Sequence, residues 1–105
     1  MKIVKFISTE EMHAFPLLYT RGEYGVLQSH LVRLLNLNSH ALSILIKGMN
    51  VKFESLSREE AQVLKDQGII NQHTRGGHFL PLKSIISLLD VIQSEKSGLI
   101  RAQLP

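Results

Sequence analysis

Three basic side chains surround a pair of glycines in the second half of the chain. His73, Arg75 and His78 flank Gly76 and Gly77 in the segment HTRGGH. Cations at a hairpin tip can contact phosphate or enter a minor groove, and glycines let the backbone approach closely. The pattern therefore indicates a nucleic-acid contact, although the same glycines also serve to close an ordinary hairpin with solvated side chains. Two histidines alone lack the further ligands of a zinc site.

A second basic group falls on a predicted helix. Arg58 and Lys65 are seven residues apart, which places them on roughly one helix face. With Lys52 and Arg75 they suit phosphate contacts. The same helix also carries acidic side chains that dilute this potential, namely Glu59, Glu60 and Asp66. A helix that reads bases usually presents Arg, Asn or Gln with few acids nearby, so the pattern favours protein binding over direct DNA reading.

The residues that could act in catalysis do not form a recognisable set. His30 and His40 have serines near them, but there is no nucleophile-elbow motif and no acid placed to orient either imidazole. The glycine pair lacks the Lys-Ser/Thr of a nucleotide-binding loop. The chain has no cysteine, which excludes disulfides, thiolate ligands and thiol catalysis. We therefore expect a protein that is not an enzyme and needs no cofactor or metal.

The first half of the chain predicts strands and then helices. β-branched and aromatic residues favour strands over residues 2–8 and 15–19, the second with Pro16 at a sheet edge, followed by a turn at residues 21–23. From about Gly25 the apolar residues recur three and four apart, which indicates a helix. A second helix, capped by Asn38 or Ser39, ends near Gly48 and Asn50, and residues 51–56 alternate as a strand should.

The second half carries the clearest local signals. Ser57 and Glu60 form a capping box, and Gly68 is placed to close the helix that follows it. Residues 69–72 and 79–80 predict a hairpin wing with HTRGGH at its tip. Residues 82–92 predict an amphipathic helix, and residues 95–105 a flexible tail.

The whole pattern is typical of one small domain. With 105 residues, 44% of them hydrophobic, and a net charge of +3, the chain can bury a hydrophobic core without disulfide or metal cross-links. We expect an α+β fold: a single compact winged-helix-like domain over residues 1–94, with mixed helices, a small sheet and a β-hairpin wing. The apolar runs are too short to span a bilayer, and acidic residues come too early for a signal peptide. A cytoplasmic or nuclear location is therefore expected.

From residue 21 to 92 the sequence resembles the Ski/Sno/Dachshund domain family. The segments that carry the resemblance are EEAQVLKDQGII, GVLQSHLVRLL, HALSILIKGMNVKFESL and FLPLKSIISLL. In the second of these, Gln28 matches the family's Leu-Pro-Gln motif, but Val26 and Leu27 precede it without the proline, and the family's cysteines are missing. The resemblance implies a winged-helix-like fold in a nuclear, transcription-regulating protein.

Two functions follow as expectations. The first is a protein-interaction module of a corepressor-like transcriptional regulator, with an exposed apolar patch at Phe15, Leu17, Tyr19 and Tyr24 that binds other regulatory proteins. The alternative is a winged helix that binds double-stranded DNA through its capped helix and wing, using Lys52, Arg58, Lys65, His73, Arg75 and His78. Neither function involves a membrane or a small-molecule substrate.

Overall fold

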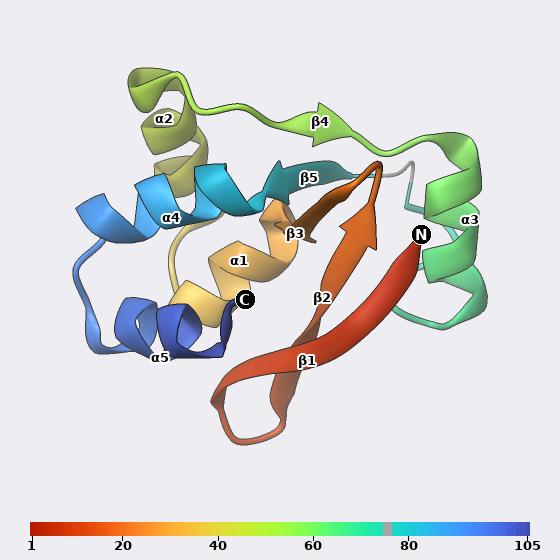
Figure 1. Cartoon of the computed structure of the whole chain (residues 1–105), viewed down its shortest axis with the longest axis horizontal. Coiled ribbons are helices and arrows are strands. Elements are labelled where there is room, and N and C mark those ends of the chain that lie inside the picture. Colours follow the sequence, from red (N-terminus) through yellow and green to blue (C-terminus); the bar gives the residue numbers. More distant parts are fainter. Residues whose placement is uncertain (75–76) are drawn as a thin grey trace.

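A computed structural model describes residues 1–74 and 77–105 of the chain. The described residues form five strands and five helices, in the order β1 (Lys2–Glu10), β2 (His13–Thr20), β3 (Glu23–Leu27), α1 (Gln28–Leu35), α2 (Ser39–Met49), β4 (Glu54–Ser55), α3 (Arg58–Asp66), β5 (His78–Pro81), α4 (Leu82–Val91) and α5 (Glu95–Gln103). The predicted α+β class is confirmed. All of these elements belong to one compact domain (Figure 1).

The five strands form one antiparallel sheet in the order β1-β2-β3-β5-β4. The first three strands are consecutive hairpins, and β5 returns from later in the chain to lie between β3 and β4. Arg21 and Gly22 connect β2 to β3 with positive φ angles of 55° and 79°. Two positive φ angles are the signature of a type I′ turn, whose twist matches that of the strands it joins.

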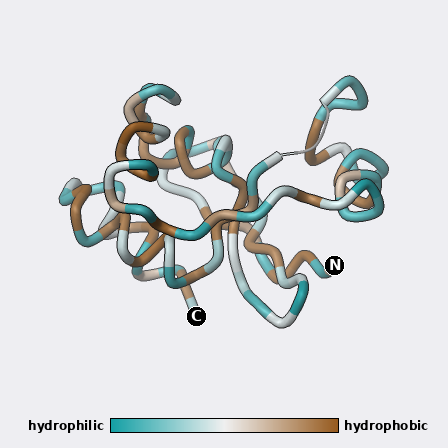
Figure 2. The backbone as a smooth tube through the Cα atoms, turned by 90° about the horizontal axis from the view of Figure 1, so that it is seen from above, coloured by the Kyte–Doolittle hydropathy of each residue, from teal (hydrophilic) through white to brown (hydrophobic). Residues whose placement is uncertain are grey.

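Helices cover both faces of the sheet, but unequally. Helices α1, α4 and α5 lie on one side of the sheet and α3 lies alone on the other (Figure 1). The alternation of side chains along β2 explains this arrangement. Leu17 faces the first side and belongs to a cluster of fifteen buried residues, whereas Leu18 faces α3 and belongs to a cluster of four. Hydrophobic segments gather toward the inside of the molecule and hydrophilic ones in its outlying turns (Figure 2).

Local signals fix the helix ends. The Asn38 side chain accepts hydrogen bonds from two backbone amides at the start of α2, as predicted for a cap. Ser57 and Glu60 form the predicted capping box of α3. Gly68 has a φ of 71°, and the Ile69 amide donates to the Leu64 carbonyl at 2.9 Å, which closes α3 as expected.

The predicted wing is wrong. Residues 69–72 form no strand in the part of the chain that the structure describes, and β5 pairs with β3 and β4. The apolar residues of this segment are instead used in packing, because Ile69 and Ile70 contact the small cluster beneath α3. The loop that carries His73 therefore starts directly from the end of α3.

Three further boundaries differ from the sequence prediction. Residues 25–27 form the end of strand β3 and not the start of a helix, because they pair with β5. The strand predicted at residues 51–56 is reduced to two residues. The predicted flexible tail at residues 95–105 is wrong over most of its length, since it contains α5, whose Ile100 is buried in the main cluster.

Pro16 predicts that its strand lies at the edge of the sheet, and this is correct only near Pro16 itself. Strand β2 lies inside the sheet, but β3 pairs only with its residues 18–20. Pro16 pairs with Phe6 of β1, in a part of β2 that β3 does not reach. The missing N–H of proline therefore leaves no gap in the pairing.

Candidate functional site

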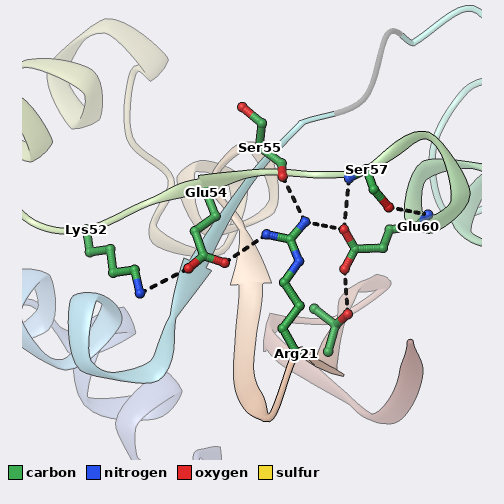
Figure 3. Close-up of polar contacts among 7 residues, drawn as sticks. Arg21, Lys52, Glu54, Ser55, Ser57 and Glu60 are labelled. Atoms are coloured by element: carbon green, nitrogen blue, oxygen red, sulfur yellow. Dashed lines mark hydrogen bonds and ion pairs between the residues drawn. The ribbon is translucent and has the colours of Figure 1, made fainter.

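A polar network begins at the turn between β2 and β3. The guanidinium of Arg21 points from this turn toward β4 and the start of α3 (Figure 3). It donates to the Glu54 carboxylate at 3.0 Å, to the Ser55 carbonyl at 3.0 Å, and to the Glu60 carboxylate. One side chain thus joins three elements, because the planar guanidinium can donate several hydrogen bonds at once.

Glu60 is the buried centre of this network. Its carboxylate accepts hydrogen bonds from Arg21, from the Ser57 backbone amide at 2.8 Å, and from the Thr20 hydroxyl. Burial raises the pKa of Glu60, but the hydrogen bonds from Arg21, Ser57 and Thr20 outweigh it and lower the pKa to about 2. The carboxylate therefore stays ionised at any ordinary pH.

Glu54 is the second carboxylate of the network. Lys52 donates to it at 3.0 Å on one side and Arg21 on the other (Figure 3). The hydrogen bond from Lys52 lowers the pKa of Glu54 most, against an opposing effect of burial. An acid–base pair needs one carboxyl group that holds a proton near neutral pH. Here the cations keep both carboxylates ionised, so the network acts as a brace between the turn and α3.

The brace holds an aromatic pair in place beside it. Tyr19 and Tyr24 flank the Arg21 turn as direct cross-strand partners, and Lys2 is the cross-strand partner of Tyr19. The two tyrosine rings pack edge to face, with centroids 4.9 Å apart. Their side chains are only partly covered, with 38% of Tyr19 and 36% of Tyr24 exposed. Three strands therefore present a row of Lys, Tyr and Tyr on one face.

The row continues into a hollow. A depression of about 460 Å³ is lined by Gly22, Glu23, Tyr24, Lys52, Pro81, Leu82, Lys83 and Ser84. It combines an aromatic ring and apolar surface with two lysines and one carboxylate. We call Lys2, Tyr19, Tyr24, Lys52 and Lys83, with this hollow, the tyrosine surface. Such a mixture of aromatic and cationic groups is typical of protein-binding surfaces.

Two members of the predicted apolar patch are not on the surface. Phe15 and Leu17 are buried in the main cluster, so this part of the prediction is wrong. The Phe15 ring packs against the His30 imidazole, with centroids 4.7 Å apart, and the Arg33 guanidinium lies over the ring at 4.9 Å. The four residues lie on one sheet face, but helices cover only the half that holds Phe15 and Leu17.

The predicted basic residues do not form one face. Arg58 and Lys65 line a hollow of about 300 Å³ on α3, as their spacing predicts. Lys52 lies on the tyrosine surface instead. The His78 ring packs against Phe53, with centroids 4.8 Å apart, and His73 lies in the loop after α3, where its amide donates to the Asn71 side chain. Arg75, the sixth candidate, lies outside the described residues.

His30 is buried beneath the sheet-facing side of α1. Only 6% of it is exposed, and its Nδ1 has no hydrogen-bond partner. Burial lowers its pKa to about 4, with a smaller contribution from Arg33. A neutral imidazole stacked on Phe15 is therefore part of the core. Among residues 1–74 and 77–105, no group of three His, Asp or Glu side chains could hold a metal ion.

Sequence reasoning missed Lys2 and Lys83 of the tyrosine surface, and the network of Arg21 with Glu54 and Glu60. Of these, Arg21 carried a usable signal. A type I′ turn favours asparagine or glycine at its first central position, and an arginine there is unusual. Such an arginine suggests an acidic partner elsewhere in the chain, and the capping residue Glu60 of a later helix was a visible candidate.

Comparisons with known proteins add no assignment. No protein-family model matches this chain, and no curated protein matches its sequence. Among the described residues, no helix has the length and hydrophobicity to cross a membrane.

Proposed function

We propose that this chain is a protein-interaction module that binds an acidic segment of a partner protein through the tyrosine surface. The observation that carries the proposal is the exposed Tyr19–Tyr24 pair, which leads into the hollow lined by Tyr24, Lys52 and Lys83. Tyrosines supply contact area at low entropic cost. Lys2, Lys83 and Lys52, the last already paired with Glu54, favour acidic residues in the partner.

The setting of this module is also part of the proposal. The resemblance to Ski/Sno/Dachshund domains supports a corepressor-like regulator of transcription in the nucleus, with other regulatory proteins as partners. In that family's winged-helix-like arrangement, α3 corresponds to the capped helix, but residues 69–72 form no strand, so a wing is not part of the proposal. The tyrosine surface lies on the sheet face opposite α3, and the Arg21 turn between its two tyrosines is bonded to Glu60 of α3.

A capture experiment followed by a binding measurement tests the proposal. The purified domain, its Tyr24→Asp variant and a Phe53→Asp control would each be used to capture proteins from nuclear extract. Phe53 is an exposed aromatic outside the tyrosine surface. A segment of each captured protein would then be titrated calorimetrically against the three forms.

We expect Tyr24→Asp to weaken binding at least ten-fold, since it removes an aromatic contact and adds a repelled charge. Phe53→Asp should bind as the wild type does, and affinity should fall as salt is raised. Equal affinities for Tyr24→Asp and the wild type would show that this surface is wrongly assigned.

The alternative function is binding of double-stranded DNA by α3. The observation in its favour is that Arg58 and Lys65 share one hollow with Gln62. Labelled random duplex DNA, titrated at two salt concentrations, tests it directly. Binding at low salt that disappears in the double variant Arg58→Glu, Lys65→Glu would support this function. Absence of binding at low salt would reject it.

A further inference from the structure

The outer edge of β1 is partly covered by a side chain that imitates a neighbouring strand. The carboxamide of Gln103, at the end of α5, accepts from the Ser8 amide at 3.0 Å and donates to the Ser8 carbonyl at 2.8 Å. Two residues facing each other in an antiparallel ladder exchange this same pair of hydrogen bonds. β1 is the last strand on its side of the sheet, so Gln103 occupies a position that another strand could take.

The next outward position along β1 is Phe6. Backbone groups alternate in direction along a strand, so the N–H and C=O of Phe6 point the same way as those of Ser8. The pairing of Phe6 with Pro16 agrees with this direction, because a proline there would otherwise leave a ladder hydrogen bond unmade. Unlike Ser8, Phe6 has no side chain from α5 bonded to its backbone.

The side chains on this part of β1 restrict what can bind. Phe6 is 53% exposed and Val4 is 40% exposed, which is a large fraction for apolar residues in a strand. Lys2 and Lys5 are the exposed charges of the same segment, whereas Glu10, at the far end, is paired with Lys96. Lysines on an edge strand oppose pairing with an identical strand, because like charges then face each other.

We propose that the edge of β1 from Lys2 to Ser8 binds an extended acidic segment of a partner protein as an added strand, in competition with the Gln103 side chain. The backbone of Phe6 and Ser8 supplies the ladder hydrogen bonds, Phe6 and Val4 supply apolar contact, and the two lysines select acidic residues. The edge shares Lys2 with the tyrosine surface but none of the residues that line its hollow, so the inference does not depend on the proposed function.

Amide chemical shifts measured by NMR test this proposal with a defined probe, an eight-residue peptide of alternating glutamate and valine. A peptide in which lysine replaces glutamate serves as the charge control. Phe6→Pro removes one outward N–H without removing a bond to β2, and Phe6→Thr keeps that N–H as its matched control. Gln103→Ala frees the Ser8 position.

The glutamate peptide should shift the amide signals of residues 2–8, and the lysine peptide should not. Phe6→Pro should weaken binding at least ten-fold and Phe6→Thr should weaken it less, with α1 signals unchanged as evidence of folding. Gln103→Ala should tighten binding about five-fold, because the peptide no longer displaces two hydrogen bonds. Phe53→Asp, outside both surfaces, should bind as the wild type does, and unchanged amide signals of Tyr24 and Lys83 separate this result from the tyrosine surface.

Three results would overturn the proposal. One is the absence of shifts in residues 2–8, and another is equal binding by Phe6→Pro and the wild type. The third is a dimer in sedimentation velocity that dissociates in Phe6→Pro, since a second copy of the chain would then be the occupant of the edge.

Discussion

The two sides of the sheet are stabilised in different ways. On the side of α1, α4 and α5, fifteen buried apolar residues pack together, and the one buried titratable group, among the residues described there, is the neutral imidazole of His30. On the side of α3, only four residues form the buried cluster. There the ionised carboxylate of Glu60 and its three donors complete the attachment of the helix.

The difference teaches that a helix with little apolar area can be held by polar contacts that are fully satisfied. A hydrogen bond to a charged group adds stability only when both partners are satisfied. Glu60 meets this condition because Arg21, Ser57 and Thr20 approach it from different elements. The same brace also holds the turn between the two tyrosines. The side of the sheet with the smaller apolar cluster therefore also positions the candidate site.

The largest effect should come from shortening one buried leucine on each side. Leu88 and Leu64 are both fully buried, in the main and the small cluster respectively. We expect Leu88→Ala to lower the free energy of unfolding by about 4 kcal/mol and Leu64→Ala by about 3 kcal/mol. Urea unfolding measures both. Hydrogen exchange should then show faster opening confined to α3 in Leu64→Ala, and opening of all helices together would contradict the comparison.

As the pH falls, stability should be lost first through His30, on the side of α1, α4 and α5. The folded pKa of His30, about 4, lies below its ordinary value of 6.5, so the unfolded state binds the proton first as the pH falls. Protonation of His30 should therefore lower the free energy of unfolding of the wild type by about 2 kcal/mol between pH 7.5 and pH 5. His30→Leu should lose less stability than the wild type over this range, as urea unfolding at the two pH values will show. Parallel losses in both proteins would mean that His30 is exposed to solvent.

The α3 side should respond to Glu60 at lower pH and by a smaller amount. Glu60→Gln keeps the shape but loses the charge that faces Arg21, and should cost about 1.5 kcal/mol at pH 7. Because the folded pKa of Glu60 is about 2, below its ordinary value of 4.5, this difference should shrink as the pH falls from 4.5 toward 2.

Glu59→Gln is the matched control for this change. It removes the same charge one position earlier in α3, where the side chain is exposed. Its effect on unfolding should stay within about 0.5 kcal/mol. An equal loss of stability in both variants would show that Glu60 stabilises the protein through the helix dipole and not through the brace.

The sequence allowed the locally encoded parts of the fold to be predicted. The cap at Asn38, the capping box at Ser57 and the closing glycine at Gly68 depend on residues within a few positions of each other. What could not be predicted depends on pairing between distant segments. Residues 25–27 read as the start of a helix because their apolar spacing continues into α1, and only pairing with β5 makes them a strand.

The candidate site was predictable to a similar extent. Arg58 and Lys65 share a face because helical spacing is local. The spacing of Phe15, Leu17 and Tyr19 shows that they share a sheet face, but not where the covering helices end. The residue that organises the site, Arg21, contacts partners more than thirty positions away, as its bonds to Glu54 and Glu60 show.

Arg21 also constrains how this sequence can change over evolutionary time. Its backbone is in the left-handed region, with a φ of 55°, where glycine or asparagine would be less strained. Glycine would relieve that strain but lose all three contacts of the guanidinium, and lysine would keep the charge without the forked geometry. Position 21 should therefore change together with positions 54 and 60. Among related sequences, this trio should covary even where the surrounding turn drifts freely.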